Sequence, residues 1–178
     1  RLMGFGLSVL KDTRNNILTP IDGWFLKGSA GYNFSKSNYF EAAIDGRYCK
    51  TWRSLFTLAG RFYNRITAGT PSFYDYSIMG GDNIARGYRY GRFRDKNITT
   101  LQSEFRAHLF WRIGMAAFAG VTNVYPTISK FDFRAYKVNV GIGLRILVDK
   151  KDNTSLRLDY AIGENGNNGF YVSFGESF

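Results

Sequence analysis

The sequence predicts an all-β protein whose strands form an antiparallel transmembrane β-barrel, and three observations support this. Apolar and polar residues alternate with a period of two along about eight to nine segments of the chain. Several of these segments reach ten residues or more, close to the ~9–11 residues with which a strand crosses a bilayer. A content of 17% aromatic residues, 20 glycines and only three prolines is typical of many strands joined by tight turns.

The first half of the chain contains four predicted strands separated by turn-rich sequences. The predicted strands occupy residues 2–10, 24–34, 40–47 and 56–66. The connections KDTRNNILTPIDG, SKSN and KTWR supply the Asp, Asn, Pro and Gly residues that turns favour. We therefore expect consecutive antiparallel neighbours in this half.

The second half repeats the pattern after a long interruption. The predicted strands occupy residues 101–111, 114–124, 138–149, 155–162 and 169–178. Alternation is clearest where Val138, Val140 and Ile142 oppose Asn139 and Gly141. No segment has the pattern of a helix, and the longest apolar run, 115–121, is far shorter than the ~18 residues of a transmembrane helix.

The polar face of the strands favours a membrane barrel over a soluble sandwich, which would give the same alternation. This face combines small residues with charges of both signs in mid-strand, as in a crowded polar lumen. The charged residues are Lys27, Arg47, Arg61, Arg65, Arg106, Arg145, Arg157, Glu41, Asp45, Glu104 and Asp159. Trp24, Tyr39, Trp52 and Trp111 lie near strand ends, where an aromatic girdle is expected.

A long loop, residues 70–97, separates the two halves. Its segment MGGDNIARGYRYGRFRDKN (79–97) carries five basic residues, two acids and four glycines, and a loop of this length is usually functional or disordered. Interleaved aromatic residues favour a loop that packs on something. Binding of single-stranded nucleic acid or of phosphate would suit such a composition, but the chain has no recognisable RNA module, and no Lys-Ser/Thr and helix follow the glycines. We therefore expect no nucleic-acid partner.

Composition also argues against catalysis and metal binding. The net charge of +10 is compatible with an anionic lipid or an acidic partner. Cys49 and His108 are the only residues of their types, so we expect no internal disulfide, no metal site and no cofactor. No nucleophile motif occurs, and we predict that the chain is not an enzyme.

The loop resembles the conserved extracellular loop of the BamA/TamA-type outer-membrane assembly-factor superfamily, also called the bacterial surface antigen family. The loop residues that carry the resemblance are Gly80, Gly81, Ala85, Arg86, Gly87 and Tyr88. The turn DTRNNILTPIDG resembles a periplasmic turn of that family at Asp12, Arg14, Pro20 and Gly23. The segment RLDYAIG and the strand that ends in FGESF resemble the last hairpin of the family. The terminal Phe178 resembles the C-terminal recognition signal of bacterial outer-membrane barrels. The resemblance covers essentially the whole chain.

The resemblance implies that residues 1–178 are the C-terminal portion of a sixteen-stranded barrel and that loop 70–97 folds into the lumen. It implies that carboxylates of the barrel wall hold Arg86, with Gly87 and Tyr88 beside it. Glu104 is the first expected partner and Asp159 the substitute, and Arg106 is expected with them as a lumen partner of the loop. The family's Phe-x-Asp-x-Gly motif is altered here, because Gly120 and Thr122 replace its Asp and second Gly.

The implied function is assistance to the insertion or folding of outer-membrane proteins, or translocation of a passenger, by an integral protein of the bacterial outer membrane. The last strand would form one side of the barrel seam through Phe170, Val172, Phe174 and Phe178. Expected partners are outer-membrane lipid, unfolded outer-membrane protein clients and accessory lipoproteins. Because nine strands do not fill the family barrel, we expect a fragment of a longer chain, or half-barrels that self-associate. A barrel that anchors or secretes a patatin-type lipase and a small passive structural or pore barrel are the alternatives.

Overall fold

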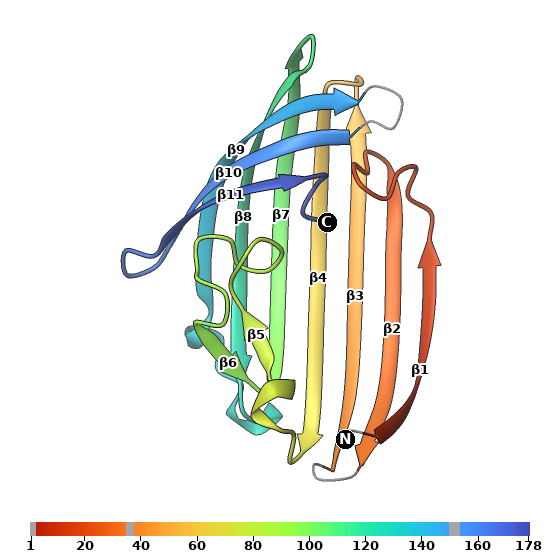
Figure 1. The fold of residues 1–178 in the computed structure, drawn as a ribbon, viewed down its shortest axis with the longest axis vertical. Coiled ribbons are helices and arrows are strands. Elements are labelled where there is room, and N and C mark those ends of the chain that lie inside the picture. Colours follow the sequence, from red (N-terminus) through yellow and green to blue (C-terminus); the bar gives the residue numbers. More distant parts are fainter. Residues whose placement is uncertain (1–2, 35–37, 150–153) are drawn as a thin grey trace.

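One curved antiparallel sheet of nine strands dominates the structure, a computed structural model that describes residues 3–34, 38–149 and 154–178. Figure 1 shows the order β1-β2-β3-β4-β7-β8-β9-β10-β11, with β1 and β11 at the two edges. The sheet strands are β1 (Met3–Asp12), β2 (Gly23–Phe34), β3 (Tyr39–Trp52), β4 (Phe56–Gly69), β7 (Asn97–Phe110), β8 (Ile113–Tyr125), β9 (Lys137–Asp149), β10 (Thr154–Gly163) and β11 (Asn168–Phe174). The predicted all-β antiparallel fold is confirmed, and the sheet of the described residues is open.

In the described part of the chain, the connections contain only short elements. A two-stranded hairpin lies in the long loop, and three single 3₁₀ turns complete the secondary structure of these residues. These elements are η1 (Phe73–Asp75), β5 (Ser77–Met79), β6 (Phe93–Asp95), η2 (Ile128–Lys130) and η3 (Phe133–Ala135). Across the described ranges, no helix is long and apolar enough to span a membrane. The predicted turns at 35–38 and 149–153 fall largely outside the described residues.

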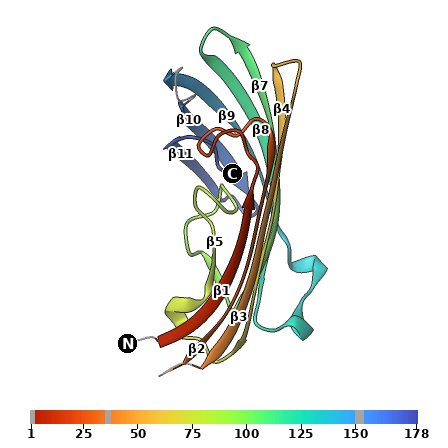
Figure 2. The ribbon, with the colours of Figure 1, turned by 90° about the vertical axis from the view of Figure 1, so that its right-hand side faces the viewer.

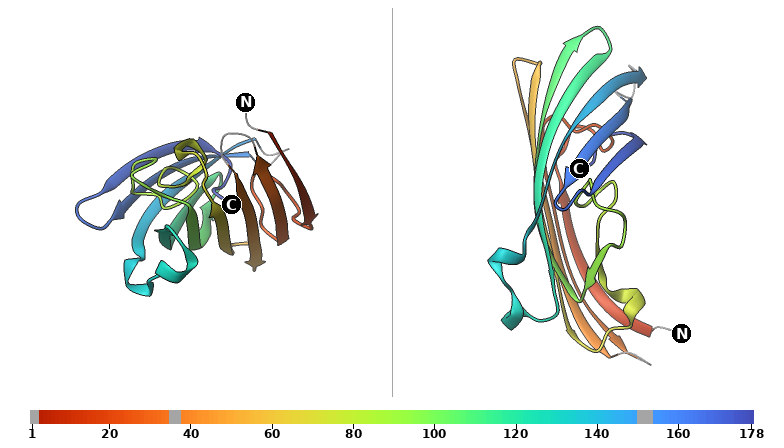
Figure 3. Two further views of the ribbon diagram at one scale, coloured as in Figure 1. Left: turned by 90° about the horizontal axis from the view of Figure 1, so that it is seen from below. Right: turned by 90° about the vertical axis from the view of Figure 1, so that its left-hand side faces the viewer.

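The sheet forms a half-cylinder with two chemically different faces. Figures 2 and 3 show the long loop and the C-terminus on its concave side. The concave face carries buried polar and charged residues such as Arg61, Gln102 and Asp159, whereas Phe62, Leu101 and Ile142 on the convex face are exposed. Side chains of neighbouring residues in a strand point to opposite faces. The alternation along the strands therefore places the buried charged residues on the concave face.

Strand length fits the thickness of a membrane. β8 and β9 have 13 residues each, which corresponds to a length of about 43 Å at ~3.3 Å per residue. A tilt of ~40° reduces the rise along the barrel axis to about 33 Å, enough to cross an apolar band of ~25 Å and reach the headgroups on both sides.

An aromatic girdle marks one end of the convex face, with one correction to the predicted set. Trp24, Trp52 and Trp111 are exposed at one end of the sheet. Trp24 lies at the start of β2, Trp52 at the end of β3 and Trp111 directly after β7. Tyr39 was expected to belong to such a girdle, but it is only 4% exposed. The prediction for Tyr39 is wrong because this residue opens β3 on the polar face, where it pairs with Gly69 of β4.

The last strand is shorter than predicted. β11 ends at Phe174, and Gly175 adopts a positive φ of +77° that turns the chain into the concave side. Phe178, expected on the seam strand, is instead 2% exposed and packs with Cys49 and Ala59. The alternation of FYVSFGESF resembles a strand to its end, but a left-handed glycine interrupts it.

The exposed convex face predicts a graded response to charge. We expect Ile142→Arg, near the middle of β9 and 59% exposed, to lower the free energy of unfolding in lipid vesicles by about 2–4 kcal/mol, because a guanidinium at the bilayer midplane is costly. The matched control is Tyr74→Arg, exposed in the long loop, with an expected change near zero. Urea titration followed by the heat-modifiable gel shift measures both. Equal stabilities would contradict a lipid-facing convex surface.

Candidate functional site

The long loop between β4 and β7 lies along the concave face of the sheet (Figure 2). Its hairpin pairs Ser77–Met79 with Phe93–Asp95, and the residues between these two strands form a compact inner turn. Met79, Ala85 and Tyr88 of the loop pack with Ile98 of β7 in a small apolar core. The loop is therefore folded against the wall as predicted from its aromatic content.

Arg86 at the inner turn is buried between two carboxylates. Its Nη2 lies 2.6 Å from Oε2 of Glu104 and its Nη1 lies 2.5 Å from Oδ2 of Asp159, and all three side chains are at most 1% exposed. The guanidinium also stacks on the ring of Phe118, with Cζ 3.4 Å from the ring centroid. These contacts join β7, β8 and β10 to one loop residue, and the structure brings together three residues that the sequence singled out.

The altered Phe-x-Asp-x-Gly motif is explained by its neighbours. Gly120 lies between Gln102 of β7 and Asn139 of β9, and a Cβ atom at position 120 would come within 2.9 Å of Asn139 Oδ1 and 3.3 Å of Gln102 Cγ. These two side chains occupy the space that an aspartate would need. Asp159, two strands away on β10, supplies the second carboxylate that pairs with Arg86.

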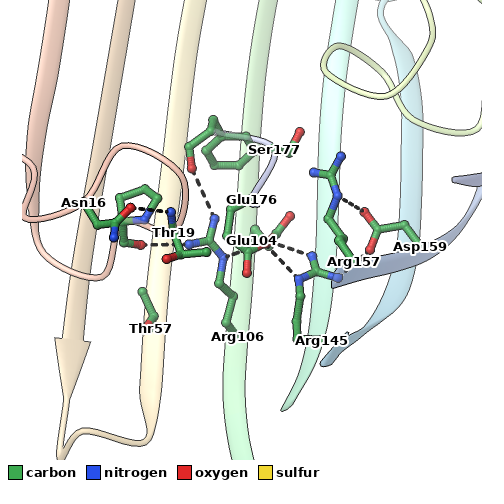
Figure 4. A network of polar contacts seen from close by, with 12 residues as sticks. Asn16, Thr19, Thr57, Glu104, Arg106, Arg145, Arg157, Asp159, Glu176 and Ser177 are labelled. Atoms are coloured by element: carbon green, nitrogen blue, oxygen red, sulfur yellow. Dashed lines mark hydrogen bonds and ion pairs between the residues drawn. The ribbon is translucent and has the colours of Figure 1, made fainter. Parts of the chain in front are cut away.

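The two carboxylates that hold Arg86 belong to a larger network of charges. Figure 4 shows the part of it that joins Glu104, Arg106, Arg145, Arg157, Asp159 and Glu176. Glu104 Oε1 accepts hydrogen bonds from Arg106 Nε at 2.8 Å and from Arg145 Nη2 at 3.0 Å. Arg145 also donates to Asp159 at 2.6 Å and to Glu176 at 2.8 Å. The cluster contains four guanidinium groups and four carboxylates: Arg86, Arg106, Arg145, Arg157, Asp82, Glu104, Asp159 and Glu176. Seven of these side chains are at most 8% exposed, whereas Asp82 is 32% exposed. The near balance of opposite charges allows the seven to be buried together.

Arg106, expected to contact the loop, instead binds the C-terminal tail and the 13–22 turn. Its Nη1 donates to the carbonyl oxygen of Pro20 at 2.9 Å and its Nη2 to that of Phe178 at 3.2 Å. Arg106 lies on the same face of β7 as Glu104, two residues further from the long loop. Its guanidinium has the same charge as that of Arg86 and cannot pair with it. The prediction that Arg106 is a direct loop partner is therefore wrong.

Gly87 and Tyr88 place the loop backbone directly on the wall. Gly87 has a φ of +101°, and a Cβ atom there would lie 2.9 Å from the backbone of Ile162 in β10. The Tyr88 hydroxyl donates to Val138 O at 2.8 Å and accepts from Glu164 N at 2.9 Å. Burial raises the pKa of Tyr88, so its hydroxyl keeps the proton that it donates.

Asp82, which the sequence reasoning did not select, fastens the loop to the last two strands. Its carboxylate pairs with Arg157 of β10 and accepts a 2.5 Å hydrogen bond from Ser173 of β11. Ser177 in the tail donates to the Asp82 carbonyl oxygen at 3.2 Å. The one available signal was an acid immediately after Gly80-Gly81 in a strongly basic loop.

Glu176, also not selected, ties the tail to the turn between β1 and β2. Its backbone N–H donates to Leu18 O at 2.7 Å, while its carboxylate binds Arg145. Within that turn, Asp12 and Arg14 form a two-point ion pair with distances of 3.0 and 2.8 Å. The first connection and the last four residues of the chain therefore meet at the same end of the lumen.

Comparison with known proteins identifies the family. The family model described as the Omp85 superfamily domain matches residues 1–178. The chain belongs to the Omp85 superfamily. No curated protein matches the chain.

Membership of the Omp85 superfamily places the chain among outer-membrane barrels that serve protein assembly and secretion. Members are generally insertion and transport factors without enzymatic activity. The described residues contain no cluster of His, Cys, Asp and Glu side chains that could hold a metal ion. The Arg86 network joins the long loop to the concave wall of an Omp85 barrel.

Loss of the Arg86 guanidinium should release the loop. We expect Arg86→Ala to lower the stability of the folded barrel by about 3–5 kcal/mol, because Glu104 and Asp159 lose a shared counter-ion while buried. Arg92→Ala, which removes an exposed loop guanidinium, is the matched control and should change stability little. Limited proteolysis of the loop and the urea midpoint of the heat-modifiable shift measure the effect; identical values for both variants would contradict the assignment.

The close approach of Gly87 generates a separate prediction. Gly87→Ala should lift the inner turn from β10 and expose Tyr88, because the added methyl group meets backbone atoms that cannot move aside. Gly166→Ala is the control, since Gly166 has a positive φ of +75° but open space around its Cα. Both variants carry backbone strain of about 1–2 kcal/mol. Protease cleavage within 79–92 should therefore rise for Gly87→Ala alone.

Proposed function

We propose that this chain forms the closing part of an outer-membrane barrel that helps to insert or fold other outer-membrane barrel proteins. The observation that carries the proposal is the condition of β11. This edge strand has seven residues, beside neighbours of ten and thirteen, and it pairs only with β10 among the described strands. An edge strand presents unpaired N–H and C=O groups that can template an incoming strand.

The length of β11 makes this edge incomplete across the membrane. Seven residues at ~3.3 Å per residue and a tilt of ~40° rise only about 18 Å, less than the ~25 Å apolar band. The chain leaves the wall at Gly175, so the unfilled part lies at the end of β11 where the tail turns inward. A client strand arriving at that end would gain hydrogen bonds that the tail does not make.

The Arg86 network supports this function by holding the seam strand from inside. Asp82 contacts both Arg157 on β10 and Ser173 on β11, and the Tyr171 hydroxyl accepts from Gly87 N at 2.8 Å. The loop therefore holds β11 on its inner side, while the backbone groups of its outer edge have no strand partner among the described residues. This attachment would keep β11 folded while its outer edge accepts a client strand.

Strand direction bears on how the barrel closes. Nine antiparallel strands in sequence leave β1 and β11 running in the same direction. A second copy related by an axis along the barrel would pair them in parallel, whereas bacterial barrels of this class are built from antiparallel neighbours. We therefore favour closure by further strands of the same barrel over paired half-barrels. Accessory lipoproteins and lipase secretion stay predictions.

Photo-cross-linking of the full-length protein in the membrane tests the proposal. A photoreactive residue replaces Phe170 on β11, Phe105 on the convex face of β7, or Tyr90 in the loop, all of which are exposed. We expect an unfolded barrel client to cross-link at position 170 and not at 105. Cross-linking of a passenger at 90 would support secretion, and the absence of cross-links at every position would support a passive barrel; either outcome overturns the proposal.

The turn at Gly175 gives the same test a functional readout. A Cβ atom at this position would lie 2.8 Å from Leu18 O. Gly175→Ala should therefore displace the tail from the lumen and let it extend β11 into the part of the wall that this strand leaves unfilled. We expect slower folding of a client by vesicles containing this variant. Gly166→Ala is again the control for backbone strain alone.

A further inference from the structure

The connection between β8 and β9, residues 126–136, projects on the side of the sheet opposite to the long loop. Figure 2 and the right view of Figure 3 show this segment on the convex side. The convex face carries the exposed apolar side chains of the strands, including Val138 and Val140 where β9 begins. The segment therefore continues the lipid-facing surface beyond the strand ends.

The segment is internally packed around one aromatic ring. Phe131 contacts Tyr125, Phe133 and Tyr136 edge to face, with centroid distances of 5.0, 4.8 and 6.0 Å. Asn123 at the end of β8 donates to Asp132 O at 2.9 Å. Edge-to-face aromatic contacts of this kind stabilise a fixed arrangement, so the segment presents its outer side chains in a defined geometry.

The outer side chains combine two apolar groups with two cations. The side chains of Ile128 and Phe133 are 65% and 78% exposed, respectively. Lys130 and Arg134 lie beside them and are exposed. Within the described residues, neither the Lys130 ammonium nor the Arg134 guanidinium forms an ion pair, and the nearby Asp132 carboxylate accepts from Arg134 N.

The height of the segment matches the headgroup layer. Strands of 13 residues rise about 33 Å when tilted, which places their ends just outside the ~25 Å apolar band. Aromatic and apolar side chains at this level enter the acyl boundary, while Lys and Arg reach toward anionic headgroups.

We propose that residues 126–136 form an interfacial anchor that binds the anionic phosphate headgroup of a membrane lipid through Lys130 and Arg134 and inserts Ile128 and Phe133 among the acyl chains. The inference rests on placement of this barrel in the outer membrane. A lipid fits better than a protein partner because the surface is continuous with the lipid-facing wall and combines separate apolar and cationic groups at the depth where a lipid offers both chemistries.

A fluorescent reporter on the full-length protein tests the anchor. Ser129→Cys, in a Cys49→Ala background, carries an environment-sensitive fluorophore, and the protein is reconstituted in phosphatidylcholine vesicles with acyl-brominated lipid, with or without phosphatidylglycerol. We expect bromine quenching in both vesicles and a larger blue shift with phosphatidylglycerol, reduced by high salt. Ile128→Ser with Phe133→Ser should remove the quenching. Lys130→Gln with Arg134→Gln should remove the phosphatidylglycerol-dependent shift.

Matched controls come from the long loop on the other side of the sheet. A reporter at Tyr74→Cys, exposed but on the concave side, should show neither effect. Arg89→Gln with Arg92→Gln removes two exposed loop cations and should leave the reporter at 129 unchanged. The heat-modifiable gel shift verifies that each variant is folded.

Two results would overturn the proposal. A reporter at 129 that is not quenched would show that the segment lies away from the acyl chains. A phosphatidylglycerol response that survives Lys130→Gln with Arg134→Gln would show that these cations do not bind the headgroup. Client cross-linking at position 170 is read separately, so failure of the anchor and failure of the insertion function are distinguishable.

Discussion

Burial of the Arg86 guanidinium is the constraint on which the rest of the lumen depends. A charge that is 1% exposed must have close counter-ions, because an unpaired buried ion costs several kcal/mol. Glu104 and Asp159 meet this need, but two buried carboxylates then require cations of their own, which Arg145 and Arg106 supply. Each added ion recruits a further element, so the neutral cluster extends from the loop to β7, β9, β10 and the C-terminal tail.

This extension connects parts of the chain that are remote in sequence. The loop reaches β11 through Asp82, and the tail reaches the turn after β1 through the backbone of Glu176. The last strand is consequently attached from inside by the loop and continued by a tail that lies in the lumen. Its outer edge has no comparable attachment among the described residues, and that asymmetry is what an insertion seam requires.

The two faces of the sheet divide the chemistry of the protein. The concave face concentrates arginines and carboxylates at spacings that neutralise one another, whereas the convex face is apolar and ends in an aromatic girdle on one side and the 126–136 anchor on the other. The convex strand surface and the projecting segment are therefore the surfaces that we expect to contact lipid.

The sequence by itself determined the nine strands of the sheet and the identity of the two faces, because period-two alternation is a local property. The importance of Arg86 followed from the resemblance of the long loop to the conserved loop of the family. The sequence also indicated Glu104 and Asp159 as inward carboxylates. Tertiary structure decided the rest. Asp82 and Glu176 gained partners through contacts that join residues tens of positions apart, Tyr39 became buried by its pairing at a strand end, and Phe178 entered the lumen because one left-handed glycine redirected the tail. Such contacts arise only when the sheet curves and brings distant segments to one concave wall.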